Sequence, residues 1–265
     1  MKKLLVIKLG GAVVTYKNSP APKVRISVIK RLVQEIKQIS LLGYRIILVH
    51  GAGSFAHDLV KKYDLQHGMK TDQQKKAFRK TQQRMLKLNK IIMAQLSRAG
   101  LNAVSLPPHT FISQTGGKLN DFDVYIVKKQ LDLNQIPVLF GDMVLDDKWG
   151  CSVLSGDTIV CFLGQKLKAE KVIFLSDVDG IYDSDPKKNP SAKLISEINN
   201  KNFNQVLRGL SPTGREDVTG EMRGKILQIK VALKRIQIMI VSGLKDQALI
   251  TVVDQDPTGT RLHFD

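Results

Sequence analysis

Short apolar runs alternate along the chain with longer segments of helical periodicity. Residues 3–9 form an apolar run that ends at Gly10 and Gly11, a pattern typical of a buried strand. Residues 24–42 repeat their apolar positions every three to four residues and are followed by Gly43, which predicts a helix and its end. The same criteria predict further strands at 45–49, 102–106, 137–140, 171–175, 236–241 and 248–253, and further helices at 71–99, 155–167 and 216–234.

This alternation predicts the class of fold. Strands that alternate with helices form a mainly parallel sheet with helices on both of its faces. We therefore expect an α/β protein, built as an αβα sandwich around a central, mainly parallel sheet. No internal repeat or low-complexity tract divides the 265 residues. We expect a single domain, 1–265, with a functional boundary near residue 170 and a linker-like stretch at 183–192.

The apolar runs and the cysteines exclude several classes of protein. No run reaches the roughly 18 apolar residues that a membrane-spanning helix needs. Lys8 interrupts the apolar start, and no small-residue cleavage site follows it, so a secretory signal is not indicated. Two cysteines are too few for a disulfide framework. We expect a cytoplasmic protein whose N-terminal run is a buried strand.

The charge is strongly positive and unevenly distributed. The chain carries 41 Lys and Arg against 24 Asp and Glu, a formal net charge of +17. Residues 70–98 alone hold nine basic residues and a single acid, Asp72. Such a segment is typical of a solvated helix face, and it also suits nucleic acid, an anionic membrane surface or an anionic small substrate. Composition alone does not choose among these.

Glycine-rich turns at predicted strand ends are the main candidate chemistry. Glycines there let backbone N–H groups approach a phosphate, and ligands of open α/β sheets bind at the carboxyl ends of the strands. The turns are Lys8-Leu9-Gly10-Gly11-Ala12, Gly51-Ala52-Gly53-Ser54-Phe55-Ala56-His57, Ser155-Gly156-Asp157 and the segment from Asp217 to Lys225. One such turn is ordinary, whereas four, two of them with a lysine, favour phosphate binding.

Simpler motif interpretations fail. The chain has no P-loop pattern. The run 51–56 fits a loose dinucleotide pattern, but the acid expected after the next strand is missing. Ser54 and His57 lack the nucleophile-elbow context of a hydrolase. Lys8, inside an apolar strand and before two glycines, is better explained as a phosphate ligand than as a surface lysine. Asp157 is either a helix N-cap or the carboxylate that holds two lysines in place.

At this point the chain resembles a known family. The motifs quoted above, together with Ser176-Asp177-Val178-Asp179-Gly180-Ile181-Tyr182, Asp217-Val218-Thr219-Gly220 and Gly259-Thr260, occur in the order typical of the amino acid kinase family. They extend from residue 8 to residue 260. The histidine that follows Gly-Ser-Phe makes the chain resemble, within this family, the isopentenyl phosphate kinases and the related fosfomycin kinases. Ala52, Ala56 and Glu221 depart from the family pattern, which has glycine at all three positions.

The resemblance implies an activity and a role for each site residue. It implies transfer of a phosphoryl group from ATP, with Mg²⁺, to isopentenyl phosphate, within an acceptor-binding half (about 1–170) and an ATP-binding half (about 171–265). The catalytic residues would be Lys8, Lys17, His57, Asp157 and Lys225. The ATP-binding residues would be Lys8, Gly10, Gly11, Ala12, Gly53, Asp177, Gly180, Tyr182, Asp185, Pro186, Lys187, Gly220 and Lys225. The acceptor-binding residues would be Ala52, Gly53, His57 and Gly156, and no protein ligand is assigned to the metal.

The resemblance also implies a homodimer and leaves the acceptor open. A fosfomycin kinase, or a kinase for another small phosphate or carboxylate, is the first alternative. The second is a non-catalytic relative that binds nucleic acid through segment 70–98, but the chain has only 6% aromatic residues to stack on bases. We expect no nucleic acid and no membrane as partners, and we interpret the basic segment as a solvated surface. For the acceptor's apolar tail, candidates at helical spacing are Phe78, Met85, Leu86 and Met93.

Overall fold

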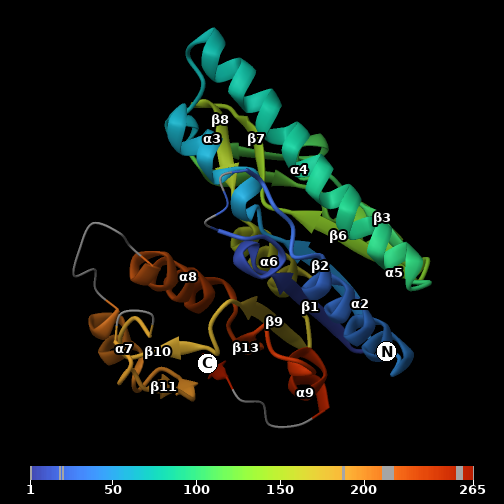
Figure 1. Cartoon of the computed structure of the whole chain (residues 1–265), viewed down its shortest axis with the longest axis vertical. Helices are drawn as coiled ribbons and strands as arrows, with labels where there is room; N and C mark the ends of the chain where they lie inside the picture. The colour runs from blue at the N-terminus through green and yellow to red at the C-terminus, as the bar shows by residue number, and fades with distance from the viewer. Residues whose placement is uncertain are drawn as a thin grey trace.

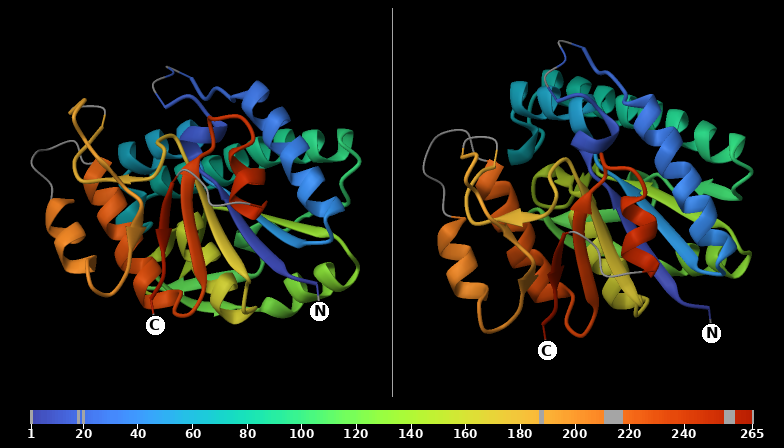
Figure 2. Two further views of the ribbon diagram at one scale, coloured as in Figure 1. Left: turned by 90° about the horizontal axis from the view of Figure 1, so that it is seen from below. Right: turned by 60° about the horizontal axis from the view of Figure 1, so that its bottom comes forward.

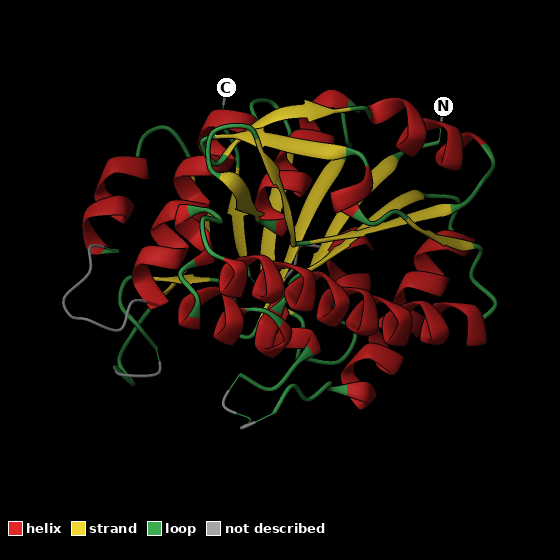
Figure 3. Cartoon of the chain, turned by 90° about the horizontal axis from the view of Figure 1, so that it is seen from above, coloured by secondary structure: helices red, strands yellow, loops and turns green. Residues whose placement is uncertain are grey.

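The computed structural model of the chain is a layered α/β structure (Figures 1 and 3). It describes residues 2–17, 19, 21–186, 189–210, 218–254 and 259–264, with the backbone alone for 218–221 and 254. An eight-stranded sheet forms the middle layer, in the order β12-β14-β13-β9-β1-β2-β6-β3. Every pair in this sheet is parallel except β13 with β14. The expected αβα sandwich with a mainly parallel sheet is confirmed.

Six of the eight strands, all except β12 and β14, closely follow the predicted apolar runs. The central strand β1 pairs with β2 on one side and with β9 on the other. The strands are β1 (Leu4–Leu9), β2 (Arg45–His50), β3 (Ala103–Ser105), β6 (Ile136–Phe140), β9 (Lys171–Ser176), β12 (Glu197–Ile198), β13 (Gln237–Ser242) and β14 (Thr260–Leu262).

Helices cover both faces of the sheet (Figure 2). One face packs against α1 (Gly11–Val14), α2 (Ile26–Leu41), the second half of α4 (Asp72–Arg98), and α9 (Ala248–Asp254). The other face packs against α5 (Val124–Asp132), α6 (Gly156–Lys166), α7 (Phe203–Gly209) and α8 (Val218–Ala232). The short α3 (His57–Lys62) lies against α4.

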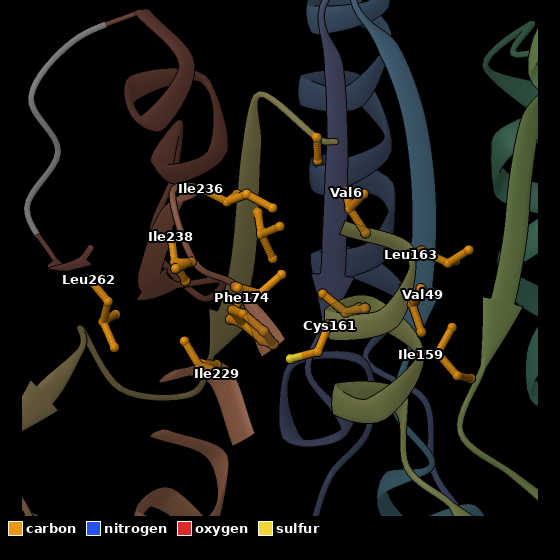
Figure 4. Close-up of a cluster of buried hydrophobic side chains, with 14 of the residues drawn as sticks. Val6, Val49, Ile159, Cys161, Leu163, Phe174, Ile229, Ile236, Ile238 and Leu262 are labelled. Atoms are coloured by element: carbon orange, nitrogen blue, oxygen red, sulfur yellow. The ribbon is translucent and has the colours of Figure 1, made fainter. Parts of the chain in front are cut away.

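The side chains of the buried strands point alternately to two hydrophobic cores, one on each face of the sheet. In β1, Leu5 and Ile7 face the core with α2 and α9, whereas Val6 faces the core with α6 and α8. Figure 4 shows the second core, in which Ile159, Cys161 and Leu163 of α6 lie close to the central strands. Strand side chains point alternately to opposite faces. Lys8, two residues after Val6, therefore lies on the face covered by α6.

A second, four-stranded sheet accounts for the irregular middle of the sequence. Its order is β5-β4-β7-β8, and its strands are β4 (Ile112–Thr115), β5 (Lys118–Phe122), β7 (Asp142–Asp146) and β8 (Gly150–Leu154). The predicted turns at 116–117 and 146–147 connect or flank these strands. The first half of α4 packs on this sheet through Ala77 and Phe78. This sheet therefore extends the N-terminal part of the chain beyond the main sheet.

The expected strand at 248–253 is wrong, because this segment is helix α9. Leu249 and Val252, three residues apart, are both fully buried against the core that contains α2. A strand would instead bury every second residue. The place beside β13 is taken by β14, which leaves this apolar run to cover the sheet as a helix. Periodicity over six residues, five of them apolar, could not distinguish these two structures.

Two further observations complete the fold. The linker-like stretch 183–192 lies between the strands of a small hairpin, β10 (Ile181–Tyr182) with β11 (Leu194–Ile195). Short 3₁₀ turns occur at η1 (Gly53–Phe55), η2 (Leu65–His67) and η3 (Pro108–Thr110). Among the helices that the structure describes, none is both long enough and apolar enough to cross a bilayer.

Candidate active site

The glycine turns meet at the carboxyl ends of the central parallel strands. The Gly10 N–H donates to the carbonyl of Leu175 at the end of β9, at 3.0 Å. The Gly51 N–H donates to the carbonyl of Leu9 at the end of β1, at 2.8 Å. These bonds continue the strand ladder past its last residues. The turns after β1 and β2 are therefore held at one edge of the sheet, where open α/β sheets bind ligands.

The first two turns approach too closely for side chains. A Cβ added to Gly11 would lie 2.5 Å from the Gly53 nitrogen, and one added to Gly51 would lie 2.6 Å from the Gly11 nitrogen. Gly53 also has φ +50 and would overlap the hydroxyl of Thr15. That hydroxyl accepts the Ser54 N–H at 3.0 Å. Glycine is therefore required here by close backbone approach and by left-handed geometry.

Lys8 and Asp157 form the central charged pair of the site. The Lys8 Nζ lies 2.6 Å from Asp157 Oδ1, although 149 positions separate the two residues. The exposed fractions of the two side chains are 11% and 19%. Lysine is rarely buried unless a partner compensates its charge, and Asp157 supplies that charge. Asp157 is not the N-cap of α6, because Ser155 occupies that position and accepts the Thr158 N–H at 3.0 Å.

Burial and neighbouring charge shift both pKa values. Burial lowers the pKa of Lys8, and Asp157 opposes this shift while Lys225 reinforces it. Burial alone would raise the pKa of Asp157, but the cations of Lys8 and Lys225 reverse this and hold it below the ordinary value. The carboxylate is therefore ionised at neutral pH and is influenced by two lysines. Lys225 reaches this place from α8, where its Nζ lies 5.9 Å from the centre of the Phe174 ring.

Gly156 lets the start of α6 approach Lys8. A Cβ on Gly156 would lie 3.3 Å from the Lys8 Cε and 3.4 Å from Val49 Cγ1. A Cβ on Gly141, which follows β6, would similarly lie 3.1 Å from the Gly156 nitrogen. The N-terminus of α6 carries free N–H groups and a positive dipole end, and it adjoins Lys8. The arrangement provides positive potential and backbone donors for bound phosphate.

The residues predicted on the ATP side cluster around β9 and its following turn. Gly180 lies against Thr260, whose hydroxyl accepts the Ile181 N–H at 2.7 Å. The Tyr182 hydroxyl donates to Asp179 Oδ2 at 3.4 Å. Asp177 follows β9 directly, while Asp185 and Pro186 lie in the segment between β10 and β11. Gly220 lies in the first turn of α8, and Lys187 lies outside the described residues.

The residues predicted on the acceptor side are less closely gathered. Ala52 and Gly53 belong to the turn after β2, and the Ala52 side chain packs partly on the core. The Ala52 methyl group is therefore accommodated by the core. Ala12, which was predicted on the ATP side, lies in α1 after the adjoining turn. His57 begins α3 directly after the η1 turn and is exposed. Lys17 is also exposed, in the loop after α1.

The tail-binding candidates of α4 have different environments. Phe78 and Met85 are buried, Phe78 in a cluster with Leu65 and Met85 in the main core. Leu86 instead points outward, with 38% of its surface exposed. Helical spacing alone could not separate core positions from exposed ones.

A buried histidine near the site was missed in the sequence. His50, the last residue of β2, is 1% exposed and stacks on Phe140 with ring centroids 5.1 Å apart. Its Nε2 lies 3.3 Å from Asn89 Oδ1, and its Nδ1 lies 3.2 Å from the Gly51 carbonyl. Burial lowers the pKa of His50 to about 4. The ring is therefore neutral near pH 7, and it contacts the second glycine turn through the Gly51 carbonyl. No local signal separates it from a surface histidine.

An arginine clamp on the loop after β13 was also missed. Arg31 of α2 donates to the carbonyls of Gly243 and Lys245, both at 2.6 Å, and pairs with Glu35 at 2.6 Å. The Lys245 ammonium in turn lies 2.8 Å from Asp179 Oδ2. The clamp connects α2 to the turn that carries the predicted ATP-side residues. The two carbonyl partners of the clamp, Gly243 and Lys245, lie more than 200 positions after Arg31 in the sequence.

The donor set around Asp157 does not resemble a protein-held metal centre. Within the described ranges, no three His, Cys, Asp or Glu side chains gather as metal ligands. The Asp157 carboxylate is already engaged by Lys8.

Together, the fold and the site define a class of phosphate-handling α/β protein. Its glycine turns and a buried lysine–carboxylate pair lie at the carboxyl edge of a parallel sheet. The chain belongs to the amino acid kinase family, whose profile it matches over residues 3–242.

Within that family, the chain is similar over nearly its whole length to isopentenyl phosphate kinases. It is 32% identical to the isopentenyl phosphate kinase of Methanothermobacter thermautotrophicus, with 98% of each chain covered. It is 34% identical to that of Methanocaldococcus jannaschii, covering 98% of this chain and 99% of the relative. A solved structure titled as isopentenyl phosphate kinase superposes with a TM-score of 0.85 at 29% identity, over 98% of this chain and 99% of the other.

Proposed function

We propose that this protein transfers the γ-phosphoryl group of ATP to isopentenyl phosphate, giving isopentenyl diphosphate. The observation that carries the proposal is the nearly full-length similarity to isopentenyl phosphate kinases. The buried pair of Lys8 and Asp157 beside Gly156 supports it, because such a site suits two phosphate groups. No comparison favours the fosfomycin kinase alternative.

The proposed chemistry relies on positioning and charge. A phosphate monoester has a second pKa of about 6, so the acceptor oxygen is already deprotonated at neutral pH. No general base is then required, and the barrier is lowered by holding two anions in line and neutralising charge. In this proposal Lys8 and Lys225 contact the transferring group, and Asp157 orients both lysines. Lys17 adds positive charge from the loop after α1.

The two substrates are proposed to enter from opposite sides of this pair. The turns that contain Gly10, Gly11 and Gly53 would hold phosphates through backbone N–H groups. The acceptor phosphate would rest on Ala52, Gly53 and Gly156, and His57 would grip it as a hydrogen-bond donor. Adenosine would lie near the ATP-side residues after β9. Mg²⁺ would accompany ATP, and it would supply positive charge that offsets the charge of the phosphates.

An acceptor panel tests the proposed function directly. ADP release is measured with isopentenyl phosphate, dimethylallyl phosphate, fosfomycin and UMP as acceptors. We expect the highest kcat/KM with isopentenyl phosphate. A higher kcat/KM with fosfomycin or UMP would refute this acceptor, and no turnover with any acceptor would favour a non-catalytic relative.

A pair of histidine variants tests the proposed acceptor grip. His57→Ala should raise the KM for isopentenyl phosphate strongly and leave the KM for ATP nearly unchanged, because only the acceptor contact is lost. His67→Ala is the matched control, since His67 is also exposed and pairs with Asp64 at the surface. Unchanged kinetics in His57→Ala would remove this residue from the site.

The physiological setting is also a proposal. We propose a cytoplasmic homodimer that acts on small molecules. Light scattering at several protein concentrations measures the mass in solution, and a monomeric mass throughout would refute the dimer.

A further inference from the structure

The exposed face of α4 carries a row of basic residues that the proposed phosphoryl transfer does not use. Consecutive residues of an α-helix are about 100° apart around its axis. Applied to α4, this spacing places six exposed basic side chains within one arc of about 100°. These residues, called the basic stripe below, are Lys76, Arg79, Lys80, Lys87, Lys90 and Arg98.

The charge of the basic stripe is not neutralised locally. Two other cations of α4 do find partners, because Lys75 pairs with Asp72 at 3.1 Å and Arg84 pairs with Asp58 at 2.8 Å. Among the residues that the structure describes, the side chains of the stripe form no ion pair and no hydrogen bond. The sequence has no acid between residues 73 and 98. Six like charges therefore face solvent together, at a mutual electrostatic cost.

The shape of the stripe is narrow and straight. From Lys76 to Arg98 it extends about 33 Å along the helix at a rise of 1.5 Å per residue. Helix α4 runs along one border of the molecule (Figures 1 and 3). Its opposite side is anchored in the cores through Met85, Leu88 and Ile92. The stripe is therefore a rigid, linear array of cations held on the outside of the fold.

We propose that the basic stripe binds the phosphate backbone of a nucleic-acid duplex, independently of sequence. A duplex presents a dense array of phosphates on two strands that wind along one axis, with about one charge per 1.7 Å of axis. A rigid row of cations complements this array along its length, and releasing the condensed counterions drives binding. The absence of any acid between residues 73 and 98 distinguishes this row from a mixed-charge, solvated helix face.

Two observations favour a duplex over other polyanions. The stripe's arc holds no aromatic side chain, whereas proteins that bind single strands stack bases on aromatic residues. Its arc also holds no large exposed apolar side chain, and the single such side chain among the described residues of α4, Leu86, lies about 20° outside the arc. Helices that lie on membranes insert such an apolar face between lipids. A backbone contact along the helix requires neither feature.

Fluorescence anisotropy with labelled 20-base-pair RNA and DNA duplexes tests the proposal. The protein is titrated without ATP between 50 and 200 mM salt, so the result does not depend on the proposed kinase activity. Each phosphate contact contributes about −0.9 to the slope of log K against log salt. The triple variant Lys80→Gln, Lys87→Gln and Lys90→Gln should make this slope shallower by up to about 2.7. Its affinity at 50 mM salt should fall at least about tenfold.

A matched variant separates the stripe from net charge. Lys193→Gln, Lys201→Gln and Lys234→Gln together remove the same charge from exposed positions of the other half. This control should retain nearly the wild-type affinity and slope. An equal loss in both triple variants would overturn the proposal, as would the absence of duplex binding by the wild type at 50 mM salt.

Two further measurements identify other occupants of the stripe. Stripe-dependent binding to vesicles containing 30% phosphatidylserine that is tighter than duplex binding would overturn the proposal in favour of a membrane. A changed molecular mass of the stripe variant in light scattering would assign the face to a second copy of the chain and also overturn the proposal.

ADP release with isopentenyl phosphate should be the same in the stripe variant and the wild type. If neither the wild type nor the stripe variant releases ADP, the proposed function is refuted, and the result for duplex binding is unaffected.

Discussion

Replacing Asp157 by asparagine tests the central charge pair. The substitution keeps the size of the side chain but removes the negative charge that lies 2.6 Å from the Lys8 ammonium. Lys8 would then be buried without compensation, since only 11% of its side chain is exposed. Removing one partner of a buried ion pair costs about 3–5 kcal/mol of folding free energy. We expect a loss of this size in Asp157→Asn.

The same substitution should impair catalysis in a pH-dependent way. Asp157 opposes the lowering of the Lys8 pKa that burial causes. Without this carboxylate the Lys8 pKa falls further, so the ammonium loses its proton at a lower pH. We expect kcat to fall about 10²–10³-fold, as when an electrostatic contact to a transition state is lost. The alkaline limb of the pH–rate profile should also move to lower pH.

Urea unfolding of two single variants and their double variant measures the coupling. Lys8→Met removes the cation with little change in shape, and the double variant Lys8→Met with Asp157→Asn leaves no uncompensated charge on this pair. The double variant should therefore be more stable than Asp157→Asn alone, although it remains inactive. A loss below about 1 kcal/mol in Asp157→Asn, with no recovery in the double variant, would refute this account of the pair.

Three further substitutions test other parts of the structure. Gly53→Ala should lower the free energy of unfolding by about 1–3 kcal/mol, because φ is +50 and the methyl group overlaps Thr15. Gly43 also has a positive φ, +89, but has open space around it, so Gly43→Ala should cost less in the same urea titration and isolates the cost of the overlap. Gly224→Ala should raise stability by about 0.5–1 kcal/mol, because this site in α8 has no neighbour within 4 Å; a lower melting temperature would contradict this. The His50 pKa is lowered from 6.5 to about 4, so between these pH values the folded state binds fewer protons than the unfolded state. The free energy of unfolding should therefore fall by about 3 kcal/mol as the pH drops from 6.5 to about 4. His50→Gln should remove this component, and an unchanged pH dependence would contradict the assignment.

The sequence was most informative where the pattern is local. Strand β1 was predicted at 3–9 and lies at Leu4–Leu9, and helix α4 was predicted at 71–99 and lies at Asp72–Arg98. Helix α4 also begins with a capping box at Thr71 and Gln74, a signal contained in four residues. Long periodic segments specify their structure because each turn repeats the same burial preference.

The sequence was least informative where the outcome depends on distant partners. Segment 248–253 contains six mostly apolar residues whose sequence pattern suits either a strand or a helix. Its helical form depends on β14 occupying the sheet beside β13 and on α2 offering a surface for Leu249. The Leu249 N–H also donates to Glu35 at 2.9 Å, a partner 214 positions away. Such contacts have no local signature.

The sequence by itself determined the class of fold, the positions of the glycine turns and the lysines that accompany them. It left Asp157 undecided between a helix cap and a lysine partner, and it treated the charge of segment 70–98 as a diffuse surface. Only the tertiary structure placed Asp157 against Lys8 and showed that six cations on one side of α4 face solvent. Local patterns record how each segment buries its own side chains. The packing of whole elements decides which distant charges meet and which remain exposed to solvent.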